Sequence, residues 1–300
     1  MSTINDAKLQ EWSQPPSESE QTRCENTERM IRDAIAASTE LRNRTIEVFA
    51  QGSFRNRTNV RRESDVDVCV LCTDFCFSDY TFAPGITDAQ VGLSPSTYTY
   101  AQYKHEVGRA LAAYFGATVV QRGKKAFDVH ATSYRVDADV VACFEYHQYQ
   151  LDSGMRPYPI RGTAFIPDGG LRVHNWPKQH YDNGVAKNEE TGRAFKGAVR
   201  VLKNLRNEME DQGLAVAKPI PSYLLECLAY NTPSNVLGAN TWTTTIEELL
   251  RHAYSVLESD MASSGLVEVN SLKYLMRGGQ PWNREQTRTF VASAWQYAGF

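Results

Sequence analysis

Apolar residues recur along this chain with two different periods, and the change of period predicts which segments are helices and which are strands. From Glu25 to Arg42 and from Tyr100 to Tyr114 they recur every three or four positions, the spacing of an amphipathic helix. The same spacing predicts helices over 189–211, 243–258 and 283–297, and a helix that opens at 220–225. Alternating β-branched and apolar residues predict strands over 46–50, 65–71, 119–120, 126–132 and 134–146.

Polar, proline-bearing and glycine-bearing segments separate these elements. Residues 1–20 are polar and contain two adjacent prolines, so we expect the start of the chain to be loosely held except around Trp12. No structure is predicted for the loop-rich stretch 73–96, and the turn residues of 150–175 indicate a hairpin at a lobe boundary. The pattern predicts a mixed α/β lobe at residues 1–175 followed by a helical lobe at residues 176–300.

The composition is that of a globular protein and argues against two classes of function. The 300 residues are 42% hydrophobic, which suits one large domain or two closely packed ones. A formal charge of −3 and a pI near 6.1 argue against a protein that coats nucleic acid, because such domains are basic. No apolar run approaches the roughly 18 residues of a membrane span, and the first residues do not resemble a secretory signal, so we expect a cytoplasmic protein.

The stretch Gln51-Gly52-Ser53 follows the predicted strand 46–50 and has the features of an anion-binding turn. Glycine lets the backbone approach an anion closely, and serine adds a hydroxyl donor. The N–H groups of a following helical turn also favour negative charge. We therefore expect these three residues to hold phosphate oxygens.

Asp65 and Asp67 lie on one face of the next predicted strand, because successive strand side chains point to opposite faces. Two neighbouring carboxylates repel each other unless a cation neutralises both. Magnesium prefers oxygen ligands and commonly binds one or two carboxylates together with substrate phosphates. A pair of such ions can stabilise the attacking and leaving oxygens of a phosphoryl transfer. The pattern predicts a site for two Mg²⁺ ions, for which Mn²⁺ could substitute.

This chemistry calls for a third carboxylate that acts as general base on the attacking hydroxyl and also touches a metal ion. Asp137 and Asp139 share one face of the predicted strand 134–146, and either could join the first pair. Asp128 is a weaker candidate, because a solvated strand residue explains it as well. Spacing alone does not choose between Asp137 and Asp139.

The helix predicted over 189–211 carries a row of cations beside its apolar stripe. Lys196, Arg200 and Lys203 are spaced at i, i+4 and i+7, so they lie along one face of the helix. Such a row is usually solvated surface, but a triphosphate substrate requires cations somewhere in the chain.

Ser222 and Tyr223 stand at the start of the helix that opens at 220–225. The Ser222 hydroxyl and the helix N-terminus could hold phosphate oxygens, and the Tyr223 ring could stack on a base. The plainer alternative is a helix cap followed by a core tyrosine.

Together these motifs resemble those of a known enzyme family. A Gly-Ser pair followed by Asp-x-Asp on the next strand is similar to the nucleotidyltransferase superfamily of polymerase beta, poly(A) polymerases, oligoadenylate synthases and cyclic GMP-AMP synthase. The longer strings Gly52–Val60, Ser64–Asp67 and Asn175–Gly184 resemble the bacterial CD-NTases, the cyclic GMP-AMP synthase/DncV-like enzymes, and within them the CdnE-like clade. Arg57, where many superfamily members carry glycine, fits that narrower clade.

The resemblance implies a fold and site residues. A polymerase-beta-like nucleotidyltransferase lobe, with a mixed sheet and an N-terminal spine helix, would precede the helical lobe, with the active site in the cleft between them. Asp139 directly precedes an apolar run, as the third aspartate of the family does. Lys203 matches the family's triphosphate-binding lysine, and Ser222-Tyr223 matches a nucleotide-binding pair of cyclic GMP-AMP synthase-like enzymes. Asn175 is a candidate for the asparagine through which some CdnE-like relatives prefer uridine.

The implied activity is that of a cyclic dinucleotide synthase. Two nucleoside triphosphates would be joined with release of pyrophosphate, and the product would signal phage infection to a downstream effector in bacteria, the CBASS response. UTP and ATP are the first substrate candidates, followed by CTP and GTP, and the product could contain uridine. We expect a monomer that binds neither a membrane nor nucleic acid.

Two other functions use the same residues. A template-independent RNA or tRNA nucleotidyltransferase would have the same carboxylates, but it should also have a wide basic surface, which the acidic balance disfavours. A non-catalytic nucleotide sensor would bind a triphosphate without releasing pyrophosphate.

Overall fold

The computed structural model describes residues 4–60 and 65–300, and the contacts within it divide the chain into two compact units. The sheet unit comprises residues 17–55 and 64–177, and the helical unit comprises residues 1–16, 56–63 and 178–300. The division after residue 177 lies close to the one predicted after residue 175. Residues 1–16 and 56–63 differ from the prediction, because they belong to the helical unit.

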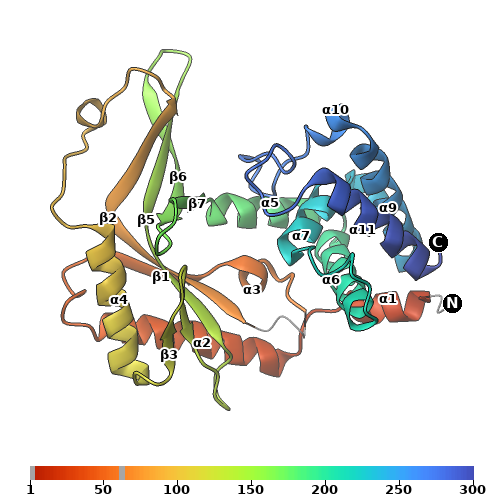
Figure 1. Cartoon of the computed structure of the whole chain (residues 1–300), viewed down its shortest axis with the longest axis horizontal. Coiled ribbons are helices and arrows are strands. Elements are labelled where there is room, and N and C mark those ends of the chain that lie inside the picture. The colour runs from red at the N-terminus through yellow and green to blue at the C-terminus, as the bar shows by residue number, and fades with distance from the viewer. Residues whose placement is uncertain (1–3, 61–64) are drawn as a thin grey trace. The chain divides into compact units, whose positions relative to one another are not determined.

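The sheet unit is a mixed sheet with helices packed on it (Figure 1). Its helices are α2 (Glu18–Ala36), α3 (Gly52–Asn56, whose last residue already belongs to the helical unit), the short 3-10 helix η1 (Asp88–Val91) and α4 (Tyr100–Phe115). Its strands are β1 (Ile46–Ala50), β2 (Val66–Phe82), β3 (Val120–Arg122), β4 (Phe127–Val129), β5 (Ala138–Leu151), β6 (Pro157–Phe165) and β7 (Val173–Asn175).

Strand β5 is the centre of the sheet. It runs parallel to β2 along most of its length, and the strand order on this path is β1-β2-β5-β4-β3. The start of β5 pairs antiparallel with β4, whereas its end pairs antiparallel with β6, which in turn pairs with β7. The start of β5 therefore lies between β2 and β4.

Helices α2 and α4 pack against each other and against the sheet. Two buried tyrosines of α4 fix this packing, because Tyr103 donates its hydroxyl to the Val70 carbonyl and Tyr100 donates to the Ala142 carbonyl, each at 2.9 Å. The helix predicted from Tyr100 to Tyr114 is thus confirmed, with its apolar face on the strands.

The helical unit contains α1 and all helices after β7 (Figure 1). They are α1 (Asp6–Trp12), α5 (Pro177–Glu190), α6 (Ala194–Asp211), α7 (Ser222–Asn231), α8 (Ser234–Leu237), α9 (Trp242–Glu258), α10 (Asp260–Ser263) and α11 (Arg284–Ala298). Their apolar faces form one core. None of the described helices has both the length and the apolar character that a membrane crossing requires.

The N-terminal segment is held more firmly from residue 4 onward than predicted, and not only around Trp12. Asn5 caps α1 by accepting the Lys8 N–H, and Leu9 is fully buried in the core of the helical unit. Complete burial of one leucine stabilises by about 2 kcal/mol. Asp6 also accepts the Thr243 backbone N–H at 2.7 Å, which ties α1 to α9.

Three further elements differ from the prediction. Helix α2 begins at Glu18, where Ser17 accepts the Glu20 N–H, and it ends at Ala36. Strand β2 continues to Phe82, into the stretch for which no structure was predicted, because β5 pairs with it that far. The helix predicted over 189–211 is α6, which begins only at Ala194, because Gly192 and Arg193 adopt left-handed φ angles of 58° and 73° and separate it from α5, a helix that was not predicted.

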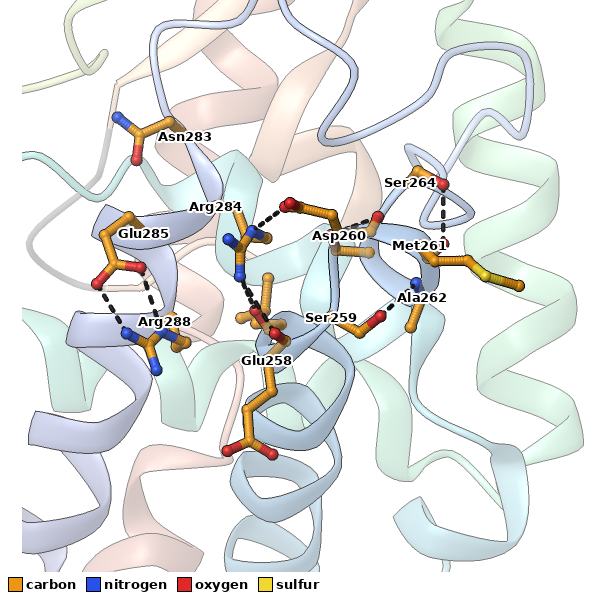
Figure 2. A network of polar contacts seen from close by, with 12 residues as sticks. Glu258, Ser259, Asp260, Met261, Ala262, Ser264, Asn283, Arg284, Glu285 and Arg288 are labelled. Carbon is orange, nitrogen blue, oxygen red and sulfur yellow. Dashed lines mark hydrogen bonds and ion pairs between the residues drawn. The ribbon is translucent and has the colours of Figure 1, made fainter.

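Arg284 joins the end of α9 to the start of α11, as Figure 2 shows. Its guanidinium donates to the Leu257 carbonyl at 2.7 Å and lies 2.6 Å from an Asp260 carboxylate oxygen. The last carbonyls of a helix have no partner within the helix, so this arginine satisfies a group at the end of α9.

Candidate active site

Three aspartates lie side by side across the start of the sheet. Asp67 on β2 is the direct partner of Asp139 on β5, and Asp139 is also the direct partner of Asp128 on β4. Neighbouring strands lie about 5 Å apart, and partner residues point to the same face. Asp65 is two residues ahead of Asp67, just before β2, and it is exposed. Register therefore brings together carboxylates that are distant in the sequence.

The electrostatics of this group are those of crowded negative charge. Partial burial raises the pKa of Asp139, and the nearby Asp128 and Asp65 carboxylates raise it further. Burial raises the pKa of Asp65 too, with a further contribution from Asp137. Burial is the larger cause of both shifts, and repulsion from neighbouring carboxylates adds to it.

The donor set fits a divalent cation in its chemistry. Carboxylate oxygens are the ligands that magnesium prefers, and a dication would offset the repulsion that adds to these pKa shifts. Within residues 4–60 and 65–300, however, no three His, Cys, Asp or Glu side chains are already arranged as a metal-binding group. The aspartates therefore suit a divalent cation by their strand register and their charge, although their side chains do not form a preformed set of ligands.

Asp137, the alternative to Asp139, is engaged elsewhere. It precedes β5, and its carboxylate accepts the Ala131 N–H at 2.7 Å and lies 3.7 Å from His130 Nδ1. Strand register thus favours Asp139 as the third carboxylate. It also brings in Asp128, which the sequence suggested was a solvated strand residue.

Gly52 stands directly against Asp67. Its φ angle is +63°, and a Cβ added there would lie 2.1 Å from Asp67 Oδ2. The Gln51 N–H donates to the Asp67 carbonyl at 2.8 Å, and half-buried Ser53 follows in α3. Glycine at this position therefore leaves room for the Asp67 carboxylate, a role that the sequence did not reveal.

Asn175 ends β7 and is exposed, with Thr163 of β6 as its strand partner. The next residue, Trp176, is buried and meets the rings of Tyr146 and His174 edge-on. The Trp176 packing anchors the segment, while the Asn175 side chain stays accessible.

The cations of the predicted row on α6 differ in exposure. Lys196 is half-buried, whereas Arg200 and Lys203 are buried, Lys203 to 1% exposure. Desolvation lowers the pKa of Lys196, and repulsion from Arg57 and Arg200 lowers it further. The buried Glu226 carboxylate partly offsets this repulsion. Within the row of three cations on α6, Lys196 is the most accessible member.

Ser222 and Tyr223 begin α7, as predicted, and both have protein partners. The Ser222 hydroxyl accepts a hydrogen bond from Arg206 at 2.9 Å. Tyr223 is half-buried and donates its hydroxyl to Glu268 at 2.9 Å, and burial followed by the nearby acidic groups raises its pKa. Ser222 does not cap α7, because Pro221 holds the N-cap position without a side-chain cap hydrogen bond. The packed Tyr223 agrees with the second half of the plainer alternative, a core tyrosine.

Comparison with known proteins decides the family. A family model described as the cGAS/DncV-like nucleotidyltransferase C-terminal helical domain matches residues 182–299. The cyclic dipyrimidine nucleotide synthase CdnE of Legionella pneumophila is 45% identical over 289 residues, which are 96% of this chain and 96% of the relative. The chain belongs to the CdnE family of nucleotidyltransferases.

Further members support this assignment. The cyclic dipyrimidine nucleotide synthase CdnE of Cecembia lonarensis is 36% identical, with 100% of both chains covered. The solved CdnE c-UMP-AMP synthase of Rhodothermus marinus, with Apcpp and Upnpp, is 31% identical. It superposes with a TM-score of 0.85 over 99% of this chain and 98% of its own. The predicted fold, a mixed-sheet nucleotidyltransferase lobe plus a helical lobe, is confirmed, as is the predicted class of enzyme.

The sequence did not reveal a buried polar group in the helical unit of this CdnE-family chain. Glu226 on α7 and His180 on α5 are hydrogen-bonded at 2.8 Å, although they are far apart in the sequence. One signal was visible: Glu226 is a single acidic residue in the apolar run Leu224–Ala229. A lone charge inside an apolar helix is rare unless it is paired.

Proposed function

We propose that this CdnE-family protein joins two nucleoside triphosphates into a cyclic dinucleotide and releases pyrophosphate. The observation that carries the proposal is the direct pairing of Asp67 with Asp139 on adjacent parallel strands, with Gly52 packed against Asp67. This arrangement places two acidic side chains next to the Gly52-Ser53 turn. Nucleotidyl transfer requires such an arrangement, because both the attacking and the leaving oxygen carry negative charge.

We assign Asp65, Asp67 and Asp139 as the residues that would hold two Mg²⁺ ions, or Mn²⁺ in their place. Bound there, the ions would polarise the donor phosphates and neutralise developing charge. Asp139 is the direct strand partner of Asp67, so it lies beside the proposed metal ligands. As the third carboxylate it would also serve as general base for the acceptor hydroxyl.

The proposed step is a direct displacement with no covalent enzyme intermediate. The acceptor ribose hydroxyl attacks the α-phosphorus of the donor, so a new P–O bond forms while the bond to pyrophosphate breaks. The hydroxyl proton passes to Asp139. A second transfer between the two joined nucleotides closes the ring and releases another pyrophosphate.

For triphosphate binding we propose Gln51, Gly52 and Ser53 in the sheet unit and Lys203, Ser222 and Tyr223 in the helical unit. The positive charge around α6 supports this assignment, and Lys196 adds a more accessible cation to the row. Because Lys203 is buried, its proposed contribution is to the positive potential of this face.

We propose that at least one substrate is a pyrimidine nucleotide, with UTP first, then ATP, CTP or GTP as partner. Two relatives are cyclic dipyrimidine synthases, and the Rhodothermus structure is described with a uridine analogue. Exposed Asn175 is the candidate for base selection. The proposal also keeps the CBASS response with a downstream effector, the bacterial cytoplasm as compartment, and a monomer as the active form.

One assay tests the function. Purified protein with Mg²⁺ is given the four ribonucleoside triphosphates singly and in pairs, and products are checked for phosphatase resistance. Resistant products that contain a pyrimidine support the proposal. Incorporation of label into added RNA would support the RNA nucleotidyltransferase instead, and triphosphate binding without pyrophosphate release would support the sensor. Asp65→Asn combined with Asp67→Asn should abolish turnover.

A further inference from the structure

Glu226 is an almost fully buried carboxylate at the centre of a polar network in the helical unit. It is 3% exposed, and its Oε1 lies 2.8 Å from His180 Nε2. Its other oxygen, Oε2, accepts the Thr58 hydroxyl at 3.2 Å. Burial alone would raise the pKa of Glu226, but His180, Lys203 and Thr58 together bring it below its ordinary value. Glu226 is therefore ionised and fully partnered.

His180 connects the Glu226 carboxylate to Asn56, which lies two residues before Thr58 in the chain. Its Nε2 also lies 2.9 Å from the side-chain amide of Asn56, which is 5% exposed. A carboxylate only accepts hydrogen bonds, so Nε2 must carry a proton and donate to Glu226. Asn56 Nδ2 contacts the same ring nitrogen, so the Asn56 amide packs directly against the imidazole that holds Glu226. The Tyr223 ring, 5.6 Å away, packs beside the imidazole.

Arg57, between Asn56 and Thr58, is held by a third buried group. Arg200 donates to the Arg57 carbonyl at 2.5 Å and to the Ser13 carbonyl at 2.7 Å, and burial lowers its pKa to about 10. Arg57 has a φ angle of 55°, in the left-handed region that is unfavourable for a residue with a Cβ. The Arg200 contact stabilises this conformation.

Three consecutive residues, 56 to 58, are thus each held by a different buried charged or ring side chain from α5, α6 or α7. We name this arrangement the turn clamp: Glu226, His180 and Arg200 on one side and residues 56–58 on the other. Asn56 is also the last residue of α3, which begins with Gly52 and Ser53. The clamped turn is therefore covalently between the Gly-Ser motif and the Asp-x-Asp motif.

We propose that Glu226, His180 and Arg200 are positioning residues for nucleotidyl transfer, acting through the 56–58 turn on the peptide that carries both motifs. The proposal rests on the function proposed above. Apolar side chains of similar volume often stabilise a core as well as a buried ion network does. Unlike apolar contacts, hydrogen bonds have a preferred geometry, so this network fixes the positions of individual atoms in the turn. None of the three side chains needs to touch a substrate.

Glu226→Gln in the full-length protein is the main test, because it keeps the shape and removes the charge. Glu258→Gln is the matched control, since Glu258 is exposed on α9 of the same unit. Turnover of the preferred triphosphate pair gives kcat and KM. Amide hydrogen exchange of peptides covering residues 52–60 reports the order of the turn, and thermal unfolding reports global stability.

We expect Glu226→Gln to lower kcat by roughly tenfold to a hundredfold, the range expected of a displacement approaching 1 Å, with KM changed much less. Exchange across residues 52–60 should be about tenfold faster, and Glu258→Gln should match the wild type. Exchange equal to that of the control would overturn the clamp. Faster exchange or a lower melting temperature with unchanged kcat would also overturn the proposal, because the network would then be structural only.

Two further variants keep the test sharp. Should Glu226→Gln fail to fold, Thr58→Val removes one hydrogen bond and leaves the Glu226–His180 pair intact, with the same expectations at smaller size. His180→Gln retains an N–H donor and should keep more of kcat than His180→Leu; equal losses would contradict the positioning role. A wild type without turnover would refute the proposed function, while the exchange comparison of Glu226→Gln with Glu258→Gln would still decide whether the clamp exists.

Discussion

Replacing Gly52 by alanine is the perturbation whose effect follows most directly from the structure. The new Cβ would lie 2.1 Å from Asp67 Oδ2, where real contacts stay above 3.0 Å, so the carboxylate must shift by about 1 Å. The backbone at φ +63° adds about 1–2 kcal/mol of strain for any residue with a side chain. The change should therefore affect activity far more than stability.

The magnitude can be divided between the two effects. A displacement of about 1 Å in a catalytic group can slow a reaction by about a hundredfold. The Asp67 carboxylate is the end of a short rotatable side chain, so its movement adds little to the loss of folding free energy. We expect kcat to fall about a hundredfold while the free energy of unfolding falls by about 1–2 kcal/mol.

Gly169→Ala is the matched control. Gly169 lies in the same unit at a φ angle of +70°, and nothing lies within 4 Å of the position that its Cβ would take. Pyrophosphate release and thermal unfolding should be measured for both variants. The two should lose similar stability, and only Gly52→Ala should lose turnover. Turnover of Gly52→Ala within threefold of the control, well short of the expected hundredfold, would refute the assignment of Asp67 and Gly52 to one site.

Four other results are expected. Asp139→Asn should raise the free energy of unfolding in metal-free buffer by up to about 1 kcal/mol, for one removed repulsion across neighbouring strands, and should abolish turnover; a lower melting temperature would contradict the charge argument. Arg57→Gly should leave stability unchanged or raise it by up to about 1 kcal/mol, because relief of left-handed strain outweighs the backbone entropy of glycine, as chemical denaturation can show. The pKa of Glu226 is lowered from its ordinary value of 4.5, so the ionised carboxylate stabilises the fold fully above pH 4.5 and loses this contribution as the pH falls further. Glu226→Gln should therefore lose less stability in acid than the wild type. Arg284→Ala should reduce stability by about 1 kcal/mol through the unsatisfied end of α9, with unchanged turnover; a loss of turnover would contradict the placement of Arg284 outside the site.

The local pattern predicted the elements that carry the site. Strand β1, the start of β2, and the carboxylate pair of Asp65 and Asp67 follow from alternation within a few residues, and helix α4 follows from its apolar stripe. The alternation of apolar and polar residues along a strand does not predict which strands are its neighbours in the sheet. The neighbour relation of Asp139 and Asp128 depends on β5 lying between β2 and β4, so Asp128 could not be placed from its own surroundings.

Long-range contacts account for what the sequence did not show. The Glu226–His180 pair joins residues on different helices, and the hold of Arg200 on Arg57 depends on tertiary packing alone. Helix α1 was missed because its burial rests mainly on Leu9, which is too little for a periodic signal. The cation row was placed correctly on one helix, but the helical pattern could not tell that Lys203 is the buried member and Lys196 the accessible one.

The central claim is that aspartates from neighbouring strands hold a pair of divalent cations beside the Gly-Ser turn. Anomalous diffraction from crystals grown with Mn²⁺ and a non-hydrolysable triphosphate analogue tests it directly. We predict two manganese peaks coordinated by carboxylate oxygens of Asp65, Asp67 and Asp139, with the analogue phosphates bridging them. Bound analogue with no manganese peak at these carboxylates, or with manganese held by other residues, would contradict the account.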